Sequence, residues 1–316
     1  MALAGGSRRI SGIRHFGTIS RILIKHGLGE AADRLFGRSR TRTKSGLPDP
    51  ARIRRALEDL GPSFIKLGQL MSTRADVFPP EYLEEFSKLQ DRVPPVPFEQ
   101  IRDLVEAELR QPLDQLFDRF DSQSLAAASV AQVHNAHLKS GEKVAVKVIR
   151  PGIFKRIRND IRLMYYFAEK IEKKFEFGQV LGLVNLVKEF ERTIFRELDM
   201  LTEAGHIERF IQNFQDVEEI YIPKVYWQYT SKSVLVMEHI EGIKMDNVAE
   251  IRRHGLDPQE VAMIGLRSFS RQLMAAGIFH ADPHPGNTIV MYDGRVSLVD
   301  FGIVGYLARC RRPSSR

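Results

Sequence analysis

The stretch His280-Ala-Asp-Pro-His-Pro-Gly-Asn287, followed by two short apolar runs and then Asp300-Phe-Gly302, decides how this chain folds. Asp282 and Asn287 lie five residues apart on a segment that its prolines and glycine keep from being helical. The tripeptide Asp-Phe-Gly alone occurs by chance, but its combination with the preceding loop at this spacing is specific. The stretch therefore predicts a loop that carries the polar side chains of a functional site.

The two apolar runs, residues 288–291 and 296–299, predict a hairpin around an Asp-Gly turn. Such a hairpin returns Asp300 to the side of Asn287. An Asn and an Asp brought together in this way are typical ligands of Mg²⁺ on the phosphates of a nucleotide, while Asp282 faces the transferred group. The region therefore predicts a site for Mg²⁺ and a nucleotide.

Residues 143–149, Lys-Val-Ala-Val-Lys-Val-Ile, alternate as a strand does, with the three valines on one face and Lys147 on the other. A lysine in the middle of a strand is costly to bury unless it meets a carboxylate or a phosphate. An edge strand with Lys147 in solvent is the alternative interpretation. The downstream loop favours a phosphate contact, because Lys147 occupies the V-A-x-K position that binds the α- and β-phosphates of ATP in kinases.

Two features depart from ordinary protein kinases. An Ala-rich segment, residues 126–134, stands where a Gly-rich phosphate loop should precede the hairpin. A second element, Lys66-Leu-Gly-Gln69, lies N-terminal to any kinase lobe. Together with the acidic cluster at 195–204 and the loop at 280–287, these elements resemble the UbiB/AarF-domain family of atypical kinases. The resemblance extends over residues 49–302.

This resemblance implies an α+β, protein kinase-like fold with a helical N-terminal extension, and ATP and Mg²⁺ as cofactors. The residues that it implies are Asp282, Lys147 and Glu203 for catalysis; Ala127, Ala128, Ser129, Lys147, Glu238 and Ile240 for ATP binding; Asn287 and Asp300 for the metal; and Lys66, Gln69, Glu197 and Asp199 for regulation.

The acidic cluster lies on a single helix predicted over 181–213, where Asp199 and Glu203 share a face. The resemblance implies that Glu203 pairs with Lys147 and that the other acidic side chains of the cluster meet Lys66. A solvated acidic face is the alternative interpretation. The two otherwise unpaired lysines favour the functional one.

The Lys66–Gln69 element falls in segment 61–76, whose apolar spacing predicts a helix. In the family this element lies over the nucleotide cleft, and Gly68 would let the backbone approach that cleft. An ordinary amphipathic helix with an exposed lysine is the alternative. We expect Lys66 to gate access to the site and its use of the metal.

Further elements follow from periodicity. Residues 153–174 and 257–276 predict helices, and residues 221–229 and 233–239 predict strands. The last strand ends in residues 237–242, which resemble a kinase hinge whose backbone holds the adenine edge. In the 280–287 loop, His280 is expected to orient the loop, and His284 replaces the lysine of ordinary kinases.

The net charge of +7 is concentrated at the N-terminus. Residues 1–46 hold ten Lys and Arg against two acidic residues, a balance of 10 − 2 = +8, so the remainder carries +7 − 8 = −1. A nucleic-acid-binding catalytic domain is therefore not indicated. The single Cys310 excludes an internal disulfide and favours a reducing compartment.

In this basic arm, apolar residues recur at near-helical spacing from Ile10 to Ile24 and are flanked by Arg14, Arg21 and Lys25. Such a helix can lie in an anionic membrane surface or pack on the kinase lobe, and both interpretations stay open. The arm fits a bacterial enzyme in the cytoplasm at the periphery of the inner membrane, with a mitochondrial transit peptide as the alternative.

Four parts are expected along the chain: the basic arm and linker at 1–46, the helical extension at 47–115, the kinase-like N-lobe at 116–241, and a partial C-lobe at 242–316. Only 14 residues follow Gly302, so a chain with an incomplete C-lobe, lacking the remainder that the family normally has, is expected.

The resemblance implies an ATPase or phosphotransferase that supports ubiquinone or related isoprenoid-quinone biosynthesis at a membrane. Its expected partners are ATP, an anionic membrane surface, quinone-type lipid intermediates and proteins of quinone biosynthesis, without nucleic acid. The alternative function is a nucleotide-dependent lipid-binding scaffold without catalytic turnover.

Overall fold

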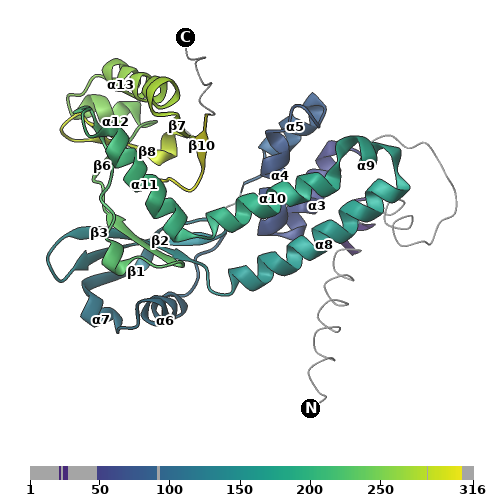
Figure 1. Ribbon diagram of the computed structural model, residues 1–316, viewed down its shortest axis with the longest axis horizontal. Coiled ribbons are helices and arrows are strands. Elements are labelled where there is room, and N and C mark those ends of the chain that lie inside the picture. The colour runs from purple at the N-terminus through teal and green to yellow at the C-terminus, as the bar shows by residue number, and fades with distance from the viewer. Residues whose placement is uncertain (1–20, 23, 28–47, 91–92, 283, 308–316) are drawn as a thin grey trace, which may run out of the picture. The chain divides into compact units, whose positions relative to one another are not determined.

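The computed structural model describes residues 21–22, 24–27, 48–90, 93–282 and 284–307 (Figure 1). The chain divides into two compact units, each described here by itself. The first comprises Met1–Pro94, Ala127–Val130 and Gly152–Ile194, and the second comprises Pro95–Ala126, Ala131–Pro151 and Phe195–Arg316. Most of the basic arm and Cys310 lie outside the described residues, so the predictions made for them stay predictions.

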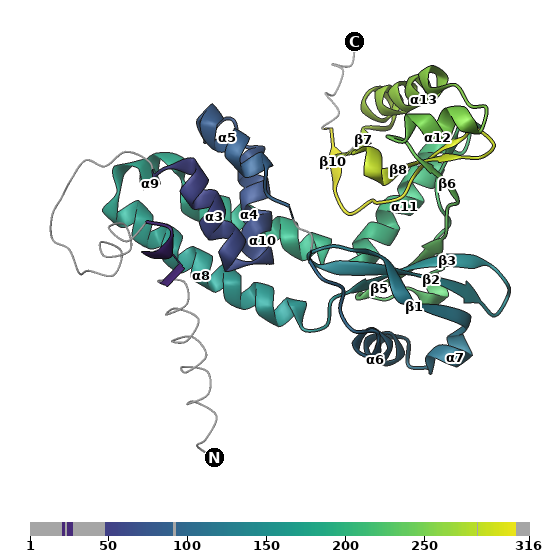
Figure 2. The same cartoon turned by 180° about the vertical axis from the view of Figure 1, so that it is seen from behind.

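The first unit is helical. Its first three helices each begin with a proline, whose fixed φ angle and missing N–H suit the first turn. The long helices α8 and α10 run side by side (Figure 2), and the Tyr165 hydroxyl joins them by donating to Glu191 at 2.7 Å. The helices of this unit are α3 (Pro50–Leu60), α4 (Pro62–Ser72), α5 (Pro80–Ser87), α8 (Ile153–Lys174), α9 (Glu176–Leu181) and α10 (Leu183–Glu197).

A buried polar contact fixes α4 on α8. The hydroxyl of Ser63, which is 3% exposed, donates to a carboxylate oxygen of Asp160 at 2.6 Å. Residues 153–194 thus belong to the helical unit, whereas the sequence placed them in the lobe of residues 116–241. The division into four functional parts stays a prediction.

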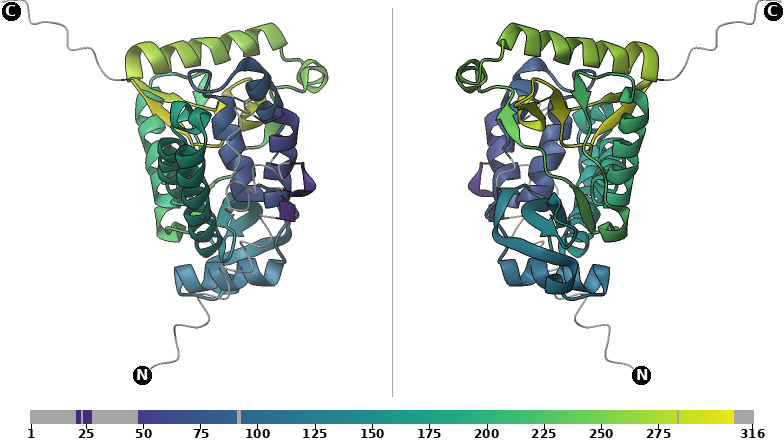
Figure 3. Two further views of the ribbon diagram at one scale, coloured as in Figure 1. Left: turned by 90° about the vertical axis from the view of Figure 1, so that its right-hand side faces the viewer. Right: turned by 90° about the vertical axis from the view of Figure 1, so that its left-hand side faces the viewer.

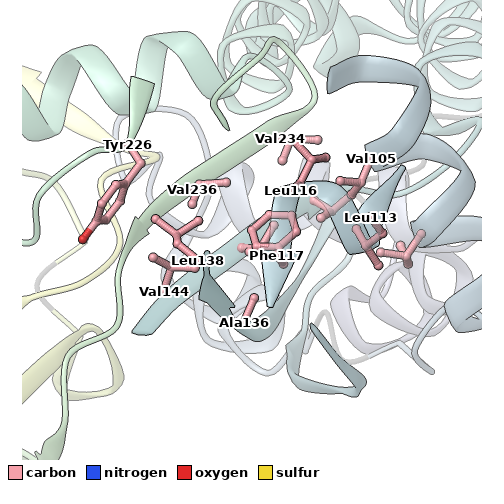
Figure 4. Close-up of a cluster of buried hydrophobic side chains, with 13 residues drawn as sticks. Val105, Leu113, Leu116, Phe117, Ala136, Leu138, Val144, Tyr226, Val234 and Val236 are labelled. Atoms are coloured by element: carbon pink, nitrogen blue, oxygen red, sulfur yellow. The ribbon is translucent and has the colours of Figure 1, made fainter. Parts of the chain in front are cut away.

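The second unit contains a four-stranded sheet in the order β1-β2-β3-β5. Its strands are β1 (Phe117–Ala127), β2 (Ala131–Leu138), β3 (Lys143–Ile149) and β5 (Val234–Glu238). The three valines of β3 are fully buried, as the alternation predicts. They pack in a core with β2, β5 and the helices α6 (Phe98–Leu109) and α7 (Leu113–Leu116), which cover this face of the sheet (Figure 4).

A second sheet, in the order β4-β9-β8-β6, supports the polar loop. The predicted hairpin is confirmed, because β8 (Thr288–Met291) pairs with β9 (Val296–Leu298) around Gly294, whose φ is +89°. Helix α13 (Pro258–Arg271) packs on this sheet (Figure 3) and continues into a π-helical turn, Gln272–Ala276. The other elements are β4 (Ile220–Tyr221), β6 (Gly242–Lys244), α12 (Val248–Arg253), β7 (Ile278–His280) and β10 (Val304–Tyr306), and the last two pair with each other.

Two predicted elements are wrong in extent. The strand expected over 221–229 shrinks to β4, one bridge at Val225 and a 3₁₀ turn, because Pro223 interrupts it and cannot donate to a ladder. The helix expected over 181–213 is two helices, α10 and α11 (Met200–Phe214). Asp199 is the N-cap between them, and its side chain accepts the amide of Leu201 at 3.2 Å.

Among the described residues, no helix combines the length and the apolar character needed to cross a bilayer.

Candidate nucleotide-binding site

Lys147 of β3 lies between two carboxylates of the second unit. Its Nζ is 2.7 and 2.9 Å from the two carboxylate oxygens of Glu203 on α11, and 3.2 Å from Oδ1 of Asp300. The Lys147 and Glu203 side chains are 15% and 4% exposed, whereas Asp300 is 46% exposed. The predicted Lys147–Glu203 pair is therefore present and buried. Asp300 lies beside this pair and is partly exposed to solvent.

The electrostatics follow from this geometry. Burial by itself lowers the pKa of a lysine, but Asp300 and Glu203 outweigh it and raise the pKa of Lys147. Burial raises the pKa of the Glu203 carboxyl, and the Lys147 ammonium opposes that shift. The same ammonium lowers the pKa of Asp300 to about 2. At neutral pH the site therefore presents a fixed cation beside an ionised, half-exposed carboxylate.

Helix α11 holds the segment after Asp300 as well as Lys147. One turn beyond Glu203, the His206 Nδ1–H donates to the backbone oxygen of Phe301 at 2.9 Å. Phe301 is fully buried and packs edge-on against Phe210 at 5.0 Å between ring centroids. Residues at i, i+3 and i+7 on one face of α11 thus fix the start of the Asp-Phe-Gly segment.

The polar loop brings Asp282 and Asn287 together. The Asn287 side-chain amide donates to a carboxylate oxygen of Asp282 at 3.1 Å and to its backbone oxygen at 3.3 Å. The Val299 amide donates to the Asn287 backbone oxygen at 3.1 Å, so the hairpin places Asp300 next to Asn287 in space. The amide nitrogen of Asn287 donates to Asp282, and its side-chain oxygen, which accepts no hydrogen bond from the described residues, is available to another ligand.

His280 links this loop to Asp300, as expected of a residue that orients the loop. Its ring, in a side chain with 2% exposure, hydrogen-bonds the backbone oxygen of Asp300 through Nε2 and accepts the Asp282 amide at Nδ1 over 3.3 Å. The ring is therefore occupied on both nitrogens. His284 accepts the Gly286 amide at 3.0 Å and shapes the local turn.

The donor set fits Mg²⁺ held jointly with phosphates. Within the part of the chain that the structure describes, both bonds to the Asp300 carboxylate, from Lys147 and from the Gly302 amide at 3.0 Å, fall on Oδ1, so Oδ2 is available to a cation. Mg²⁺ typically takes one or two protein oxygens and completes its shell with phosphates and water. In the same ranges no three His, Cys, Asp or Glu side chains form a cage that would bind a metal alone.

The predicted hinge follows β5. The Glu238 side chain turns away from Lys147, because it accepts the Tyr221 hydroxyl at 2.8 Å and the Lys224 amide at 3.2 Å. Only the backbone of Glu238 is thus suited to an adenine edge. The His239 amide donates to the Lys143 oxygen at 3.1 Å, whereas the Ile240 amide, among described residues, donates to no backbone oxygen. This leaves Ile240 as a donor for a ligand.

The Ala-rich segment connects β1 to β2 with Ala127 half-buried, Ala128 exposed and Ser129 buried. None of these residues has a positive φ angle, so alanine suits the backbone here without glycine's freedom. The structure assigns residues 127–130 to the first unit, and their contact with a nucleotide stays a prediction.

The Lys66–Gln69 element lies on α4, as the pattern predicts. The approach of Gly68 to a cleft is a prediction that the structure corrects. A Cβ at Gly68 would lie 2.2 Å from Leu89 and 3.0 Å from Leu57, so the glycine allows close packing inside the first unit. The Gln69 side chain donates to the Leu89 backbone oxygen at 3.1 Å and fixes the same leucine.

The regulatory pairing stays a prediction. Lys66 belongs to the first unit, whereas Glu197, the last residue of α10, and Asp199 belong to the second. Asp199 lies at the N-cap of α11 and not on its helical face beside Glu203, since the chain bends at this point.

Two functional neighbours were missed from the sequence. Gln272, at the start of the π-helical turn, is 3% exposed and accepts the His280 amide at 2.8 Å. His206 holds Phe301, as described above. The signal for Gln272 was a polar residue on the otherwise apolar face of the helix, and the signal for His206 was its spacing of three from Glu203.

Comparisons with known proteins identify the family of the chain. The ABC1 atypical kinase-like domain matches residues 88–314. The probable protein kinase UbiB of Marinobacter nauticus is 46% identical over 261 residues, which cover 81% of this chain and 48% of that protein. The chloroplastic protein ACTIVITY OF BC1 COMPLEX KINASE 7 of Arabidopsis thaliana is 40% identical over 253 residues, which cover 80% of this chain and 36% of that protein.

Among solved structures, the complex of Rv3197 with erythromycin from Mycobacterium tuberculosis is 29% identical and covers 79% of this chain and 63% of that one, with a TM-score of 0.52. The chain spans about half the length of the two UbiB relatives from Marinobacter nauticus and Azotobacter vinelandii, at 48% and 50%. The matched region includes the Lys147–Glu203 pair, the polar loop and Asp300. The chain belongs to the ABC1 atypical kinase-like family, with an α+β, kinase-like fold.

Proposed function

We propose that this chain provides the nucleotide-binding part of an atypical kinase-like ATPase or phosphotransferase that supports ubiquinone biosynthesis. The observation that carries the proposal is the position of Lys147, bonded to buried Glu203 and to half-exposed Asp300, beside the Asp282–Asn287 loop. The names of the bacterial relatives support the biosynthetic role.

Each residue has a physical task in this proposal. Glu203 holds the Lys147 ammonium on the sheet, so that it can contact the α- and β-phosphates of ATP without reorganising. Asp300 and Asn287 would hold Mg²⁺, which neutralises phosphate charge when bound. Asp282 is exposed and accepts the Asn287 amide, which orients its carboxylate to accept a proton or position a water.

The nucleoside would lie between Lys147 and the hinge. The backbone oxygen of Glu238 and the amide of Ile240 would bind the adenine edge, and Ala127, Ala128 and Ser129 would cover the phosphates. Lys66 and Gln69, with Glu197 and Asp199, would restrain access. These assignments rest on the resemblance of the motifs and on the unused amide of Ile240.

The alternative is a nucleotide-dependent lipid-binding scaffold without turnover. The solved complex of Rv3197 with erythromycin supports this alternative, because it shows a structural relative bound to a small organic molecule. In either case we propose that the protein works in the bacterial cytoplasm, peripheral to the inner membrane, with quinone-type lipids and biosynthetic proteins as partners. The net charge of +8 in residues 1–46 supports an anionic membrane surface.

Thermal melting with Mg²⁺-ATP tests the nucleotide site. A ligand at a concentration 100 times its Kd stabilises the folded state by about 2.7 kcal/mol, which raises Tm by about 5–10 °C in a domain of this size. Asp300→Asn should remove most of the Mg²⁺-dependent part of this shift. A variant that keeps the full shift would show that the metal is held elsewhere.

Turnover separates the two functions. ATPase rates are measured with and without anionic liposomes and a quinone head-group mimic, for the wild type and Asp282→Asn. A rate that falls at least about 100-fold in the variant supports catalysis. Nucleotide-dependent liposome binding, equal in both proteins and without turnover, supports the scaffold.

A further inference from the structure

Asn135 of β2 contains an unexplained polar atom. Its side-chain oxygen, Oδ1, is the one buried side-chain nitrogen or oxygen atom without a hydrogen-bond partner in the described ranges. Buried polar atoms in folded proteins are nearly always bonded, because an unpaired one forfeits its interaction with water. An exception of this kind indicates a partner that is present only when a ligand or a water is bound.

The neighbouring polar residues of β2 have hydrogen-bond partners within the protein, as expected of residues with a structural role. Gln132 and His134 are 1% and 0% exposed, and they bond each other at 2.8 Å. Gln132 also accepts the Val96 amide at 2.8 Å, and His134 donates to the Asp121 backbone oxygen at 2.8 Å. These two side chains lie on the core face of the sheet and are fully bonded, so the missing partner is particular to Asn135.

The register of the sheet places Asn135 on the other face, the face of Lys147. In antiparallel strands, directly opposed residues point to the same side. Val133 opposes Lys147, and Asn135 opposes Ala145. On the far side of β3, Met237 of β5 opposes Ala145. Asn135, Ala145 and Met237 therefore form one row across the sheet, which we call the nucleoside row.

The nucleoside row lies between the phosphate end of the site and the hinge. It is two residues along β3 from Lys147, a distance of about 7 Å. On β5 it is followed at once by Glu238 and the segment with the unused Ile240 amide. A nucleotide with its phosphates on Lys147 and its base edge on Ile240 must pass over this row.

We propose that Asn135 is a specificity-determining residue, whose Oδ1 accepts a hydrogen bond from the nucleoside part of the bound nucleotide. The donor is an N–H of the base or a hydroxyl of the ribose. This inference rests on the proposed nucleotide site and adds to it a residue that none of the kinase-like motifs contains. A nucleotide that lacks the donor leaves Oδ1 buried and unpaired and therefore binds more weakly than one that has it.

The test compares Mg²⁺ complexes of four triphosphates, those of adenosine, 2′-deoxyadenosine, 3′-deoxyadenosine and purine riboside, by calorimetry on the whole chain. The wild type should bind ATP about tenfold more tightly than the one analogue that lacks the bonded donor. The analogue whose disadvantage Asn135→Leu abolishes identifies the donor, because the Glu238 backbone oxygen would also accept the base amine in the wild type.

Asn135→Leu removes the acceptor while keeping a side chain of similar size. It should bind ATP about tenfold more weakly and lose the preference over that analogue. Its ligand-free Tm should stay equal to or above that of the wild type, because an unpaired buried polar atom has been replaced by an apolar one. The matched control, Asn159→Leu at an exposed position of α8, should retain wild-type affinities and preference.

Two results overturn the inference separately from the function. If the wild type binds ATP but discriminates none of the analogues, or if Asn135→Leu leaves all four affinities unchanged, Oδ1 is bonded by a water only. If the wild type binds no nucleotide at all, the proposed function fails as well.

Discussion

Replacing Glu203 by glutamine tests the pair on which the site depends. The substitution keeps the shape of the side chain but sets a neutral amide against the Lys147 ammonium, in place of two carboxylate contacts of 2.7 and 2.9 Å. Removing one partner of a buried ion pair costs about 3–5 kcal/mol. Asp300 remains 3.2 Å from Lys147 and partly compensates the ammonium charge, so a cost at the lower end of this range, about 3 kcal/mol, is expected. The compensation is partial because Asp300 is 46% exposed and therefore screened by solvent.

In a domain of about 150–250 residues, 1 kcal/mol changes Tm by about 2–4 °C, so Glu203→Gln should lower the melting temperature of the second unit by about 6–12 °C. Calorimetry at neutral pH measures the shift. Glu208→Gln on the same helix is the matched control. Among the described residues, Glu208 accepts one hydrogen bond, from the Trp227 indole N–H at 3.0 Å at the surface, and glutamine can still accept it. It should cost less than about 0.5 kcal/mol.

A double-mutant cycle with Lys147→Met separates the ion pair from local packing. Removing both charges leaves neither group unpaired, so the double variant should lose at least about 1 kcal/mol less than the sum of the single variants. The reasoning is refuted if Glu203→Gln melts like Glu208→Gln, or if the two substitutions are additive.

Two further predictions concern packing and pH. Gly68→Ala should destabilise the folded protein by about 1–2 kcal/mol, because the added methyl would lie 2.2 Å from a buried leucine. Gly205→Ala on α11, where nothing lies within 4 Å of the added methyl, should stabilise the folded protein by about 0.5–1 kcal/mol. Equal Tm changes in the two variants would contradict this reasoning. Burial lowers the pKa of His206 below its usual 6.5, so its contribution to stability is present above pH 6.5 and lost as the pH falls. The wild type should therefore lose more Tm than His206→Gln between pH 7 and 5, and parallel pH profiles would refute that origin.

Local chemistry made much of the site predictable. The prolines at 283 and 285 exclude an α-helix, and the structure has only a short 3₁₀ helix there, Pro285–Asn287. The Asp293-Gly294 turn between apolar runs specifies the hairpin that returns Asp300 to Asn287. The alternation of residues 143–149 placed the valines in the core and Lys147 opposite them. These features succeed because each depends on neighbours within a few residues along the chain.

The failures occur where tertiary contacts compete with local pattern. The helical periodicity of residues 181–213 continues through Asp199, yet the helix breaks there, where the Met200 amide donates to the backbone oxygen of Lys232 at 3.1 Å. Gly68 looked like a means to approach a cleft, but the space beside it is filled by leucines of its own unit. A periodic pattern does not reveal which distant backbone supplies a hydrogen bond or fills a space.

The sequence by itself determined the chemical inventory of the site, a lysine on a strand and Asp, Asn and Asp on a loop and hairpin, because spacing and turn residues constrain the backbone locally. Only the tertiary structure decided which carboxylates meet Lys147, which way Glu238 faces, and that His206 and Gln272 hold the loop from α11 and the π-helical turn. It also revealed that the side-chain oxygen of Asn135 is buried and has no hydrogen-bond partner among the described residues. The physical reason is that burial and pairing between distant segments depend on how the elements pack, and strand register, unlike strand propensity, is set by residues far apart in the chain.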